Sequence, residues 1–106
     1  MTSDPERALE TRIIQAGLPE PEQQYKFLPN RKYLADFCWP VDGLIVEVQG
    51  GGYNRGRHHR PAGYEADCER MNAAQLAGWK ILYVTPAMIA DGRAIAWIEK
   101  ALEVRG

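Results

Sequence analysis

The sequence has few of the features that mark secreted or membrane proteins. Its two cysteines, Cys38 and Cys68, lie 30 residues apart without CxxC spacing, so we predict neither a disulfide framework nor a zinc site. No basic amino-terminal stretch precedes an apolar run, and no window approaches the roughly 20 apolar residues of a membrane-spanning helix. We therefore expect a cytoplasmic protein with reduced thiols and no membrane contact.

An excess of charge of either sign is also missing. The 106 residues include 13 Lys and Arg against 14 Asp and Glu, a formal net charge of -1, which offers no global argument for a nucleic-acid partner. The distribution is uneven, because acidic residues gather in the first 22 positions and basic ones between residues 25 and 60. With 45% apolar residues, the length suits one compact domain, residues 1–106, carrying a local basic patch.

The hydrophobic pattern predicts an α/β fold with the order αβββαβα. A Ser or Asp cap and Gly17 bound a helix over residues 5–16, and Gly78 ends a second over 64–77. The turn signal Asp42-Gly43 favours an antiparallel hairpin within a three-strand meander. The strands are predicted at 24–28, 32–39, 44–49 and 80–85, and terminal helices at 86–89 and 92–104. We expect a mixed sheet of about four strands flanked by helices.

Two polar residues interrupt the most strand-like segment, "LIVEVQGGG". Because side chains alternate along a strand, Glu47 and Gln49 share a face, and a tight 42–43 turn would bring Asp36 of the preceding strand beside them. Two adjacent carboxylates resist ionising together and need a cation, a shared proton or a basic partner. Mg²⁺ is the simplest cation, since it takes one or two carboxylates and leaves positions for water and phosphate.

The competing interpretation is structural. Glu47 and Gln49 could face solvent from a half-exposed sheet. The three glycines at 50–52 favour the functional interpretation, because they let a ligand or another backbone approach closely.

The spacing of these residues resembles that of a known nuclease superfamily. Asp36 followed eleven residues later by Glu47-Val48-Gln49 resembles the PD-(D/E)XK motif. The wider match, "YLADFCWP" and "LIVEVQGGGYNRGRHHRPAGYEADCERMNAAQLAGWKILYVT", resembles small phage and prophage endonucleases related to the very short patch repair endonuclease. It covers roughly residues 6 to 90 and implies a restriction-endonuclease-like core in a bacterial or phage-infected cell.

The resemblance implies roles for individual residues. Asp36 and Glu47 would be metal ligands for Mg²⁺, with Mn²⁺ able to substitute, and the Val48 carbonyl a third. Gln49 stands where the superfamily most often has lysine, and since glutamine is no general base, it would position water or ligate metal. An acidic residue of the first helix often completes such sites; Glu6 and Glu10 share a face, and we favour Glu6, although both also suit a helix start.

A basic loop, "RGRHHR", follows the glycines. Histidine titrates near neutral pH and arginine stabilises developing charge, and the family pattern places its histidine at His58. We expect His58 and Arg57 to support the phosphate or leaving group. The other basic residues and a flanking tyrosine are expected to contact DNA: Arg55, His59, Arg60 and Tyr53.

On the second helix and the last strand we favour structural roles. Asp67 and Arg70 match the helix of the resembled family, so this helix could face the site, but we favour an intrahelical ion pair between them. Met71, Trp79 and Tyr83 are expected in the core. Tyr64, like Tyr53, could stack on an unpaired base.

The sequence thus predicts a Mg²⁺-dependent DNA endonuclease that nicks one strand as a monomer or cuts both as a homodimer. A DNA-binding module that has lost catalysis stays open, with Gln49 as the mark of the loss. A small-molecule or protein-binding α/β domain is the third alternative, and it leaves the glycines and the basic loop unexplained.

Overall fold

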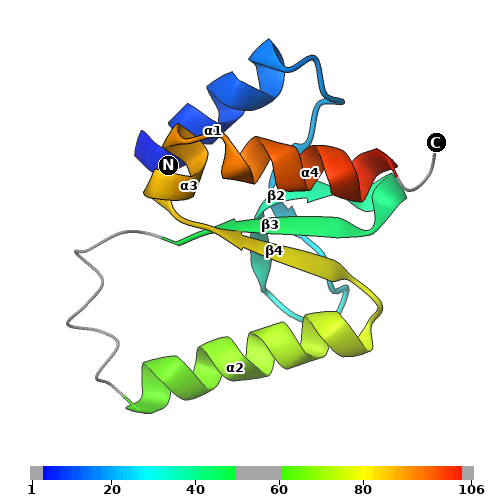
Figure 1. Ribbon diagram of the computed structural model, residues 1–106. Helices are drawn as coiled ribbons and strands as arrows, with labels where there is room; N and C mark the ends of the chain where they lie inside the picture. Colours follow the sequence, from blue (N-terminus) through cyan, green and yellow to red (C-terminus); the bar gives the residue numbers. More distant parts are fainter. Residues whose placement is uncertain (1–3, 50–60, 104–106) are drawn as a thin grey trace.

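The computed structural model describes residues 4–49 and 61–103. Figure 1 shows their helices and strands in the predicted αβββαβα order, with a short 3-10 turn added. In chain order the elements are α1 (Asp4–Gln15), β1 (Glu22–Lys26), β2 (Leu34–Trp39), η1 (Pro40–Asp42), β3 (Leu44–Val48), α2 (Pro61–Leu76), β4 (Lys80–Val84), α3 (Pro86–Ala90) and α4 (Arg93–Glu103).

The four strands form one mixed sheet in the order β1-β2-β3-β4. β1, β2 and β3 are the predicted antiparallel meander, and β4 joins β3 in parallel after the α2 crossover. Between β2 and β3 the chain turns through η1 and Gly43, whose φ of 66° is left-handed, a conformation that glycine adopts without a steric penalty. This turn sets the register in which Phe37 pairs with Val46.

Helices cover the two faces of the sheet unequally (Figure 1): α1, α3 and α4 lie on one face and α2 on the other. The three-helix side holds the larger core. Its buried residues are Leu9, Ile13, Phe37, Trp39, Leu44, Val46, Val84, Ile89, Ala94, Ile98 and Leu102. The α2 side has a smaller cluster of Phe27, Ala35, Cys38, Ile45 and Ala74, against which Tyr25 and Trp79 pack.

A glycine ends both α1 and α2, as the sequence predicts. Gly17 has φ 71° and Gly78 φ 94°. After α2, the Gly78 N–H donates to Gln75 O at 3.0 Å and the Trp79 N–H donates to Ala74 O at 3.1 Å. These two bonds make a Schellman motif, which satisfies carbonyls at the helix end.

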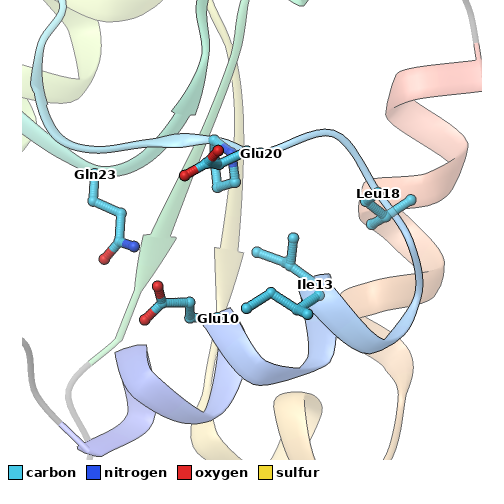
Figure 2. A pocket seen from close by; sticks show the side chains of 7 residues that line it. Glu10, Ile13, Leu18, Glu20 and Gln23 are labelled. Carbon is cyan, nitrogen blue, oxygen red and sulfur yellow. The ribbon is translucent and has the colours of Figure 1, made fainter.

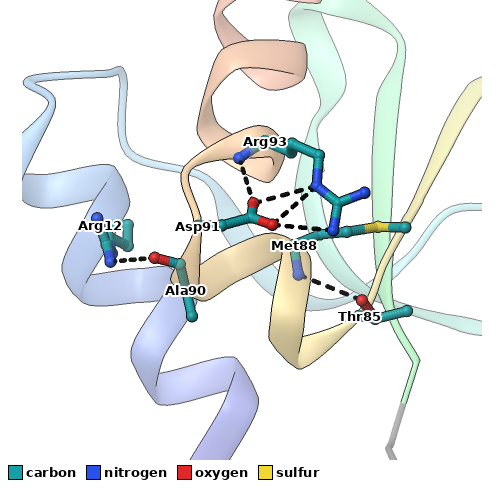
Figure 3. Close-up of polar contacts among 6 residues, drawn as sticks. All are labelled: Arg12, Thr85, Met88, Ala90, Asp91 and Arg93. Atoms are coloured by element: carbon teal, nitrogen blue, oxygen red, sulfur yellow. Dashed lines mark hydrogen bonds and ion pairs between the residues drawn. The ribbon is translucent and has the colours of Figure 1, made fainter.

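Polar contacts stabilise the α3–α4 corner, and one of them links this corner to α1 (Figure 3). Thr85 Oγ1 accepts from the Met88 N–H at 3.3 Å at the start of α3. Asp91 accepts from the Arg93 N–H at 3.0 Å and forms an ion pair with the Arg93 guanidinium at 2.9 Å. Arg12 on α1 donates to the Ala90 carbonyl at 2.8 Å, which ties the first helix to the end of α3.

Several predicted boundaries differ from the structure by one residue, and those of β1, β2 and α2 differ by more. β2 begins at Leu34 and not at residue 32. β1 begins at Glu22 and ends at Lys26, two residues before the predicted 24–28, because its exposed residues EQQ lack apolar alternation and pairing with β2 alone defines them. α2 begins at Pro61 and not at residue 64, since proline is tolerated in the first helical turn, where an N–H has no partner to lose. Among the described residues, no helix is long and apolar enough to span a membrane.

Candidate active site

The register of β2 and β3 brings Asp36 and Glu47 together. Phe37 pairs with Val46, so the next position outward sets Asp36 opposite Glu47, and opposite residues of antiparallel strands share a face. Asp36 Oδ2 accepts a 2.8 Å hydrogen bond from the Val48 N–H. This bond ties the carboxylate of β2 to the end of β3.

Glu47 is buried under α2, with 5% of its surface exposed. The solvent-facing alternative is therefore wrong for this residue. Burial, and after it the negative charge of Asp36, raises the pKa of Glu47 from 4.5 to about 7 against the opposing effect of the Arg70 cation. A carboxyl group with such a pKa exchanges its proton near neutrality.

Arg70 is the residue of this site that sequence reasoning placed wrongly. Its Nη1 lies 3.3 Å from Glu47 Oε2, so the ion pair crosses from α2 to β3 instead of running along the helix to Asp67. The spacing of Asp67 and Arg70 permits both arrangements. Which of them forms depends on how α2 docks on the sheet, and a helical periodicity does not contain that information.

The Arg70–Glu47 contact is close but incompletely satisfied. Oε2 and Nη1 are both buried, and neither has a hydrogen-bond partner. At 3.3 Å the opposite charges attract without hydrogen-bond geometry, so burial of the two groups is only partly compensated. Oε2 is orphaned only in lacking a hydrogen bond, since the Arg70 cation lies beside it, and a buried oxygen without a hydrogen bond can accept a further ligand.

Tyr83 also lies at this site and not in the core. It is the parallel partner of Glu47 on β4, so the two side chains share the α2 face of the sheet, and Tyr83 is 45% exposed. Its pKa is raised by partial burial and by the negative charge of Glu47. The prediction of a core position was wrong because β4 is an edge strand, where Tyr83 stays half exposed.

Gln49 continues the sheet through its main chain. Its N–H donates to the Val84 carbonyl at 2.7 Å, and its side chain is exposed. The residue is therefore held at the end of β3, on the same face as Glu47 by strand alternation. The predicted basic loop and its flanking tyrosine lie outside the described residues: Tyr53, Arg55, Arg57, His58, His59 and Arg60. The helical position of Tyr64 is described, but its side chain is not.

The two acidic candidates of α1 lie in the helical layer opposite α2. Glu6 is half-buried in the first turn. Glu10 lines a pocket of about 380 Å³ with Ile13, Leu18, Glu20 and Gln23. Figure 2 shows the Glu10 carboxylate directed toward this space between α1 and the following linker. Participation of Glu6 in the site stays a prediction.

The donor set suits a hard divalent ion with few protein ligands. No group of three or more His, Cys, Asp or Glu residues within 4–49 and 61–103 could hold a metal, which argues against a protein-enclosed metal cage among these residues. Two carboxylates, one with an orphaned buried oxygen, match the one or two that Mg²⁺ uses alongside water and phosphate oxygens. The residues present therefore fit Mg²⁺.

Comparison with known proteins places the fold. No protein-family model matches the sequence, and no curated protein matches it either. A solved structure matches with a TM-score of 0.71 over 97% of this chain and 97% of the other: the catalytic domain of the homing endonuclease I-Bth0305I. The chain has the fold of that catalytic domain. At 13% identity the likeness is one of fold, and it confirms the expected α/β architecture of a mixed sheet flanked by helices.

Proposed function

We propose that this chain is a metal-dependent DNA endonuclease that hydrolyses phosphodiester bonds. The observation that carries the proposal is the meeting of Asp36 and Glu47 on paired strands, with Glu47 buried and Oε2 orphaned. The fold shared with a homing endonuclease catalytic domain supports it. Membership of the PD-(D/E)XK superfamily, and kinship with the very short patch repair endonucleases, belong to the same proposal.

In this proposal Asp36, Glu47 and the Val48 carbonyl hold Mg²⁺, and Mn²⁺ can replace it. The bound ion would neutralise phosphate charge and lower the pKa of a bound water. The Asp36–Val48 hydrogen bond of 2.8 Å keeps the carboxylate and the end of β3 in fixed relation before substrate binds. Such preorganisation avoids a reorganisation penalty at the moment of reaction.

The remaining roles are proposed from side-chain chemistry and, for Gln49, also from its place at the end of β3. The exposed Gln49 amide orients the attacking water by hydrogen bonding, and Glu6 is the acidic residue that completes the site. His58 and Arg57 would support the phosphate or the leaving group, since both can donate hydrogen bonds to oxygen. The DNA backbone and bases would be contacted by Tyr53, Arg55, His59 and Arg60.

A catalytically silent DNA-binding module is the second candidate. Two observations favour it: Gln49 cannot take a proton from water, and Arg70 already pairs with Glu47 at 3.3 Å. A site whose carboxylate is neutralised by arginine could bind phosphate without cutting it. Such a module would hold DNA in EDTA and leave it intact in Mg²⁺.

The deciding experiment uses purified protein with supercoiled plasmid, branched DNA and single-stranded DNA in Mg²⁺, Mn²⁺ or EDTA. Asp36→Asn and Glu47→Gln remove one charge each with little change of shape. Glu99→Gln removes an exposed carboxylate from α4 on the opposite layer and is the matched control. Nicked circles indicate single-strand cutting, and direct linear product indicates a dimer.

Metal-dependent cutting that both site variants lose and Glu99→Gln keeps would support the nuclease. Cutting by Asp36→Asn at the wild-type rate would refute the assignment. Intact DNA under all conditions, with a gel shift that needs no metal, would favour the silent binder.

A further inference from the structure

The Arg70 guanidinium lies beside the carboxylate of Glu47, one of the two carboxylates proposed above as metal ligands. The guanidinium extends from α2, with 22% of its side chain exposed, to a carboxylate side chain that is 6% exposed. Oε2 of that carboxylate has the guanidinium Nη1 at 3.3 Å and no hydrogen bond. Arg70 therefore compensates the buried charge of Glu47 by proximity more than by directed bonding.

The local charge count separates two states. Asp36, Glu47 and Arg70 together carry a net charge of -1 when all are ionised. A divalent ion added to that set makes the total +1 and puts two cations within a few ångström of one carboxylate, where like charges repel. The carboxylate pair without Arg70 is neutralised by one divalent ion alone.

We propose that Arg70 is the resident counter-ion of Glu47 and that a divalent cation displaces it, so that arginine and metal occupy the site alternately. This inference rests on the proposed function, because it assumes the metal ligands named there. Asp67 lies three residues earlier on α2 and is exposed, so the displaced guanidinium has an acceptor one turn away. Asp67, the intrahelical partner that the sequence favours, then pairs with Arg70 in the metal-bound state.

Displacement should weaken metal binding to the wild-type protein, because the metal must break the Arg70–Glu47 ion pair before it binds. We would measure Mn²⁺ binding by the electron paramagnetic resonance signal of free Mn²⁺, without DNA. The proteins are wild type, Arg70→Gln and Arg31→Gln. Arg31, which precedes β2, forms an exposed 3.8 Å ion pair with Glu69 of α2. Arg31→Gln therefore removes the same charge as Arg70→Gln, but away from the site.

We expect Arg70→Gln to bind Mn²⁺ about tenfold more tightly than wild type, a typical size for coupling between two ligands of one site. Arg31→Gln should bind as wild type does. Equal or weaker binding by Arg70→Gln, or an equal gain in both variants, would overturn the exchange. Failure of wild type and Arg70→Gln alike to bind Mn²⁺ would overturn it together with the metal site of the proposed function.

A second measurement uses only wild-type protein, so its result does not depend on whether an Arg70 variant folds. In wild-type protein, Mg²⁺ titration would be followed by the Arg70 side-chain N–H resonance, with Arg31 as the exposed internal reference. We expect the Arg70 signal to shift and its hydrogen exchange to quicken as metal binds. An Arg70 signal that stays unchanged at saturating Mg²⁺ would show that arginine and metal share the site, which contradicts displacement while leaving metal binding intact.

Discussion

The buried carboxyl of Glu47 should make the free energy of unfolding depend on pH in a defined direction. Its pKa rises from 4.5 to about 7 on folding, chiefly through burial, so between these values the native state holds a proton that the unfolded chain has lost. Stability therefore falls as pH rises through this window. At about 1.4 kcal/mol per pH unit, the full effect is about 3 kcal/mol.

Glu47→Gln isolates this contribution, because glutamine has nearly the same shape and does not titrate. We would measure urea unfolding of both proteins at pH 5 and pH 8 in EDTA, which keeps metal from binding the carboxylates. We expect wild type to lose about 2 to 3 kcal/mol relative to Glu47→Gln between these pH values. Glu69→Gln, which removes an exposed carboxylate from α2, controls for net charge.

The result decides whether burial or the ion pair dominates at Glu47. If wild type gains stability relative to Glu47→Gln as pH rises, attraction to Arg70 at 3.3 Å outweighs the loss of hydration. A difference that does not change with pH would refute the raised pKa, and with it the view that α2 keeps water from this carboxylate.

Two further predictions concern the core and the thiols. Phe37→Ala should destabilise the protein by about 3 to 5 kcal/mol in urea unfolding, because Phe37 is fully buried; Val41→Ala, at a side chain 90% exposed, should change stability by less than about 0.5 kcal/mol, and comparable losses would contradict the assigned core. Iodoacetamide should label the exposed Cys68 in native protein and Cys38 only after unfolding. Burial and the charge of Glu22 raise the pKa of Cys38 to about 12, so mass spectrometry of native protein showing two adducts would refute its burial.

The sequence predicts those features that depend on neighbours along the chain. Asp42-Gly43 signals the hairpin, but the register that joins Asp36 to Glu47 comes from the longer connection through η1 and the left-handed Gly43, because a two-residue turn at 42–43 would set Asp36 opposite Gln49. Gly78 ends α2 for an equally local reason, its φ of 94°. These signals suffice for the element order and for the pairing of the two strands that carry Asp36 and Glu47, while the exact register depends on the η1 turn.

Tertiary docking decides what the sequence leaves undetermined. The sequence favours structural roles for Arg70 and Tyr83, but both residues lie beside Glu47. Spacing along α2 specifies which residues share a helical face, but it does not specify which strand that face meets. Likewise, a tyrosine in an apolar strand is buried only if another element covers it, and Tyr83 is 45% exposed.

The uneven packing of α2 explains why a buried carboxylate and an open site can coexist. The second half of the helix is anchored, since Ala74 is fully buried in the smaller core and Trp79 packs beyond the helix end. The described side chains from residue 63 to 69 are exposed. Arg70 stands at the boundary between the two halves, so it can reach the Glu47 carboxylate while remaining near solvent. A guanidinium fixed in the packed half could not leave Glu47, and one in the exposed half would not be drawn to it. The proposed exchange of Arg70 for metal depends on this boundary position.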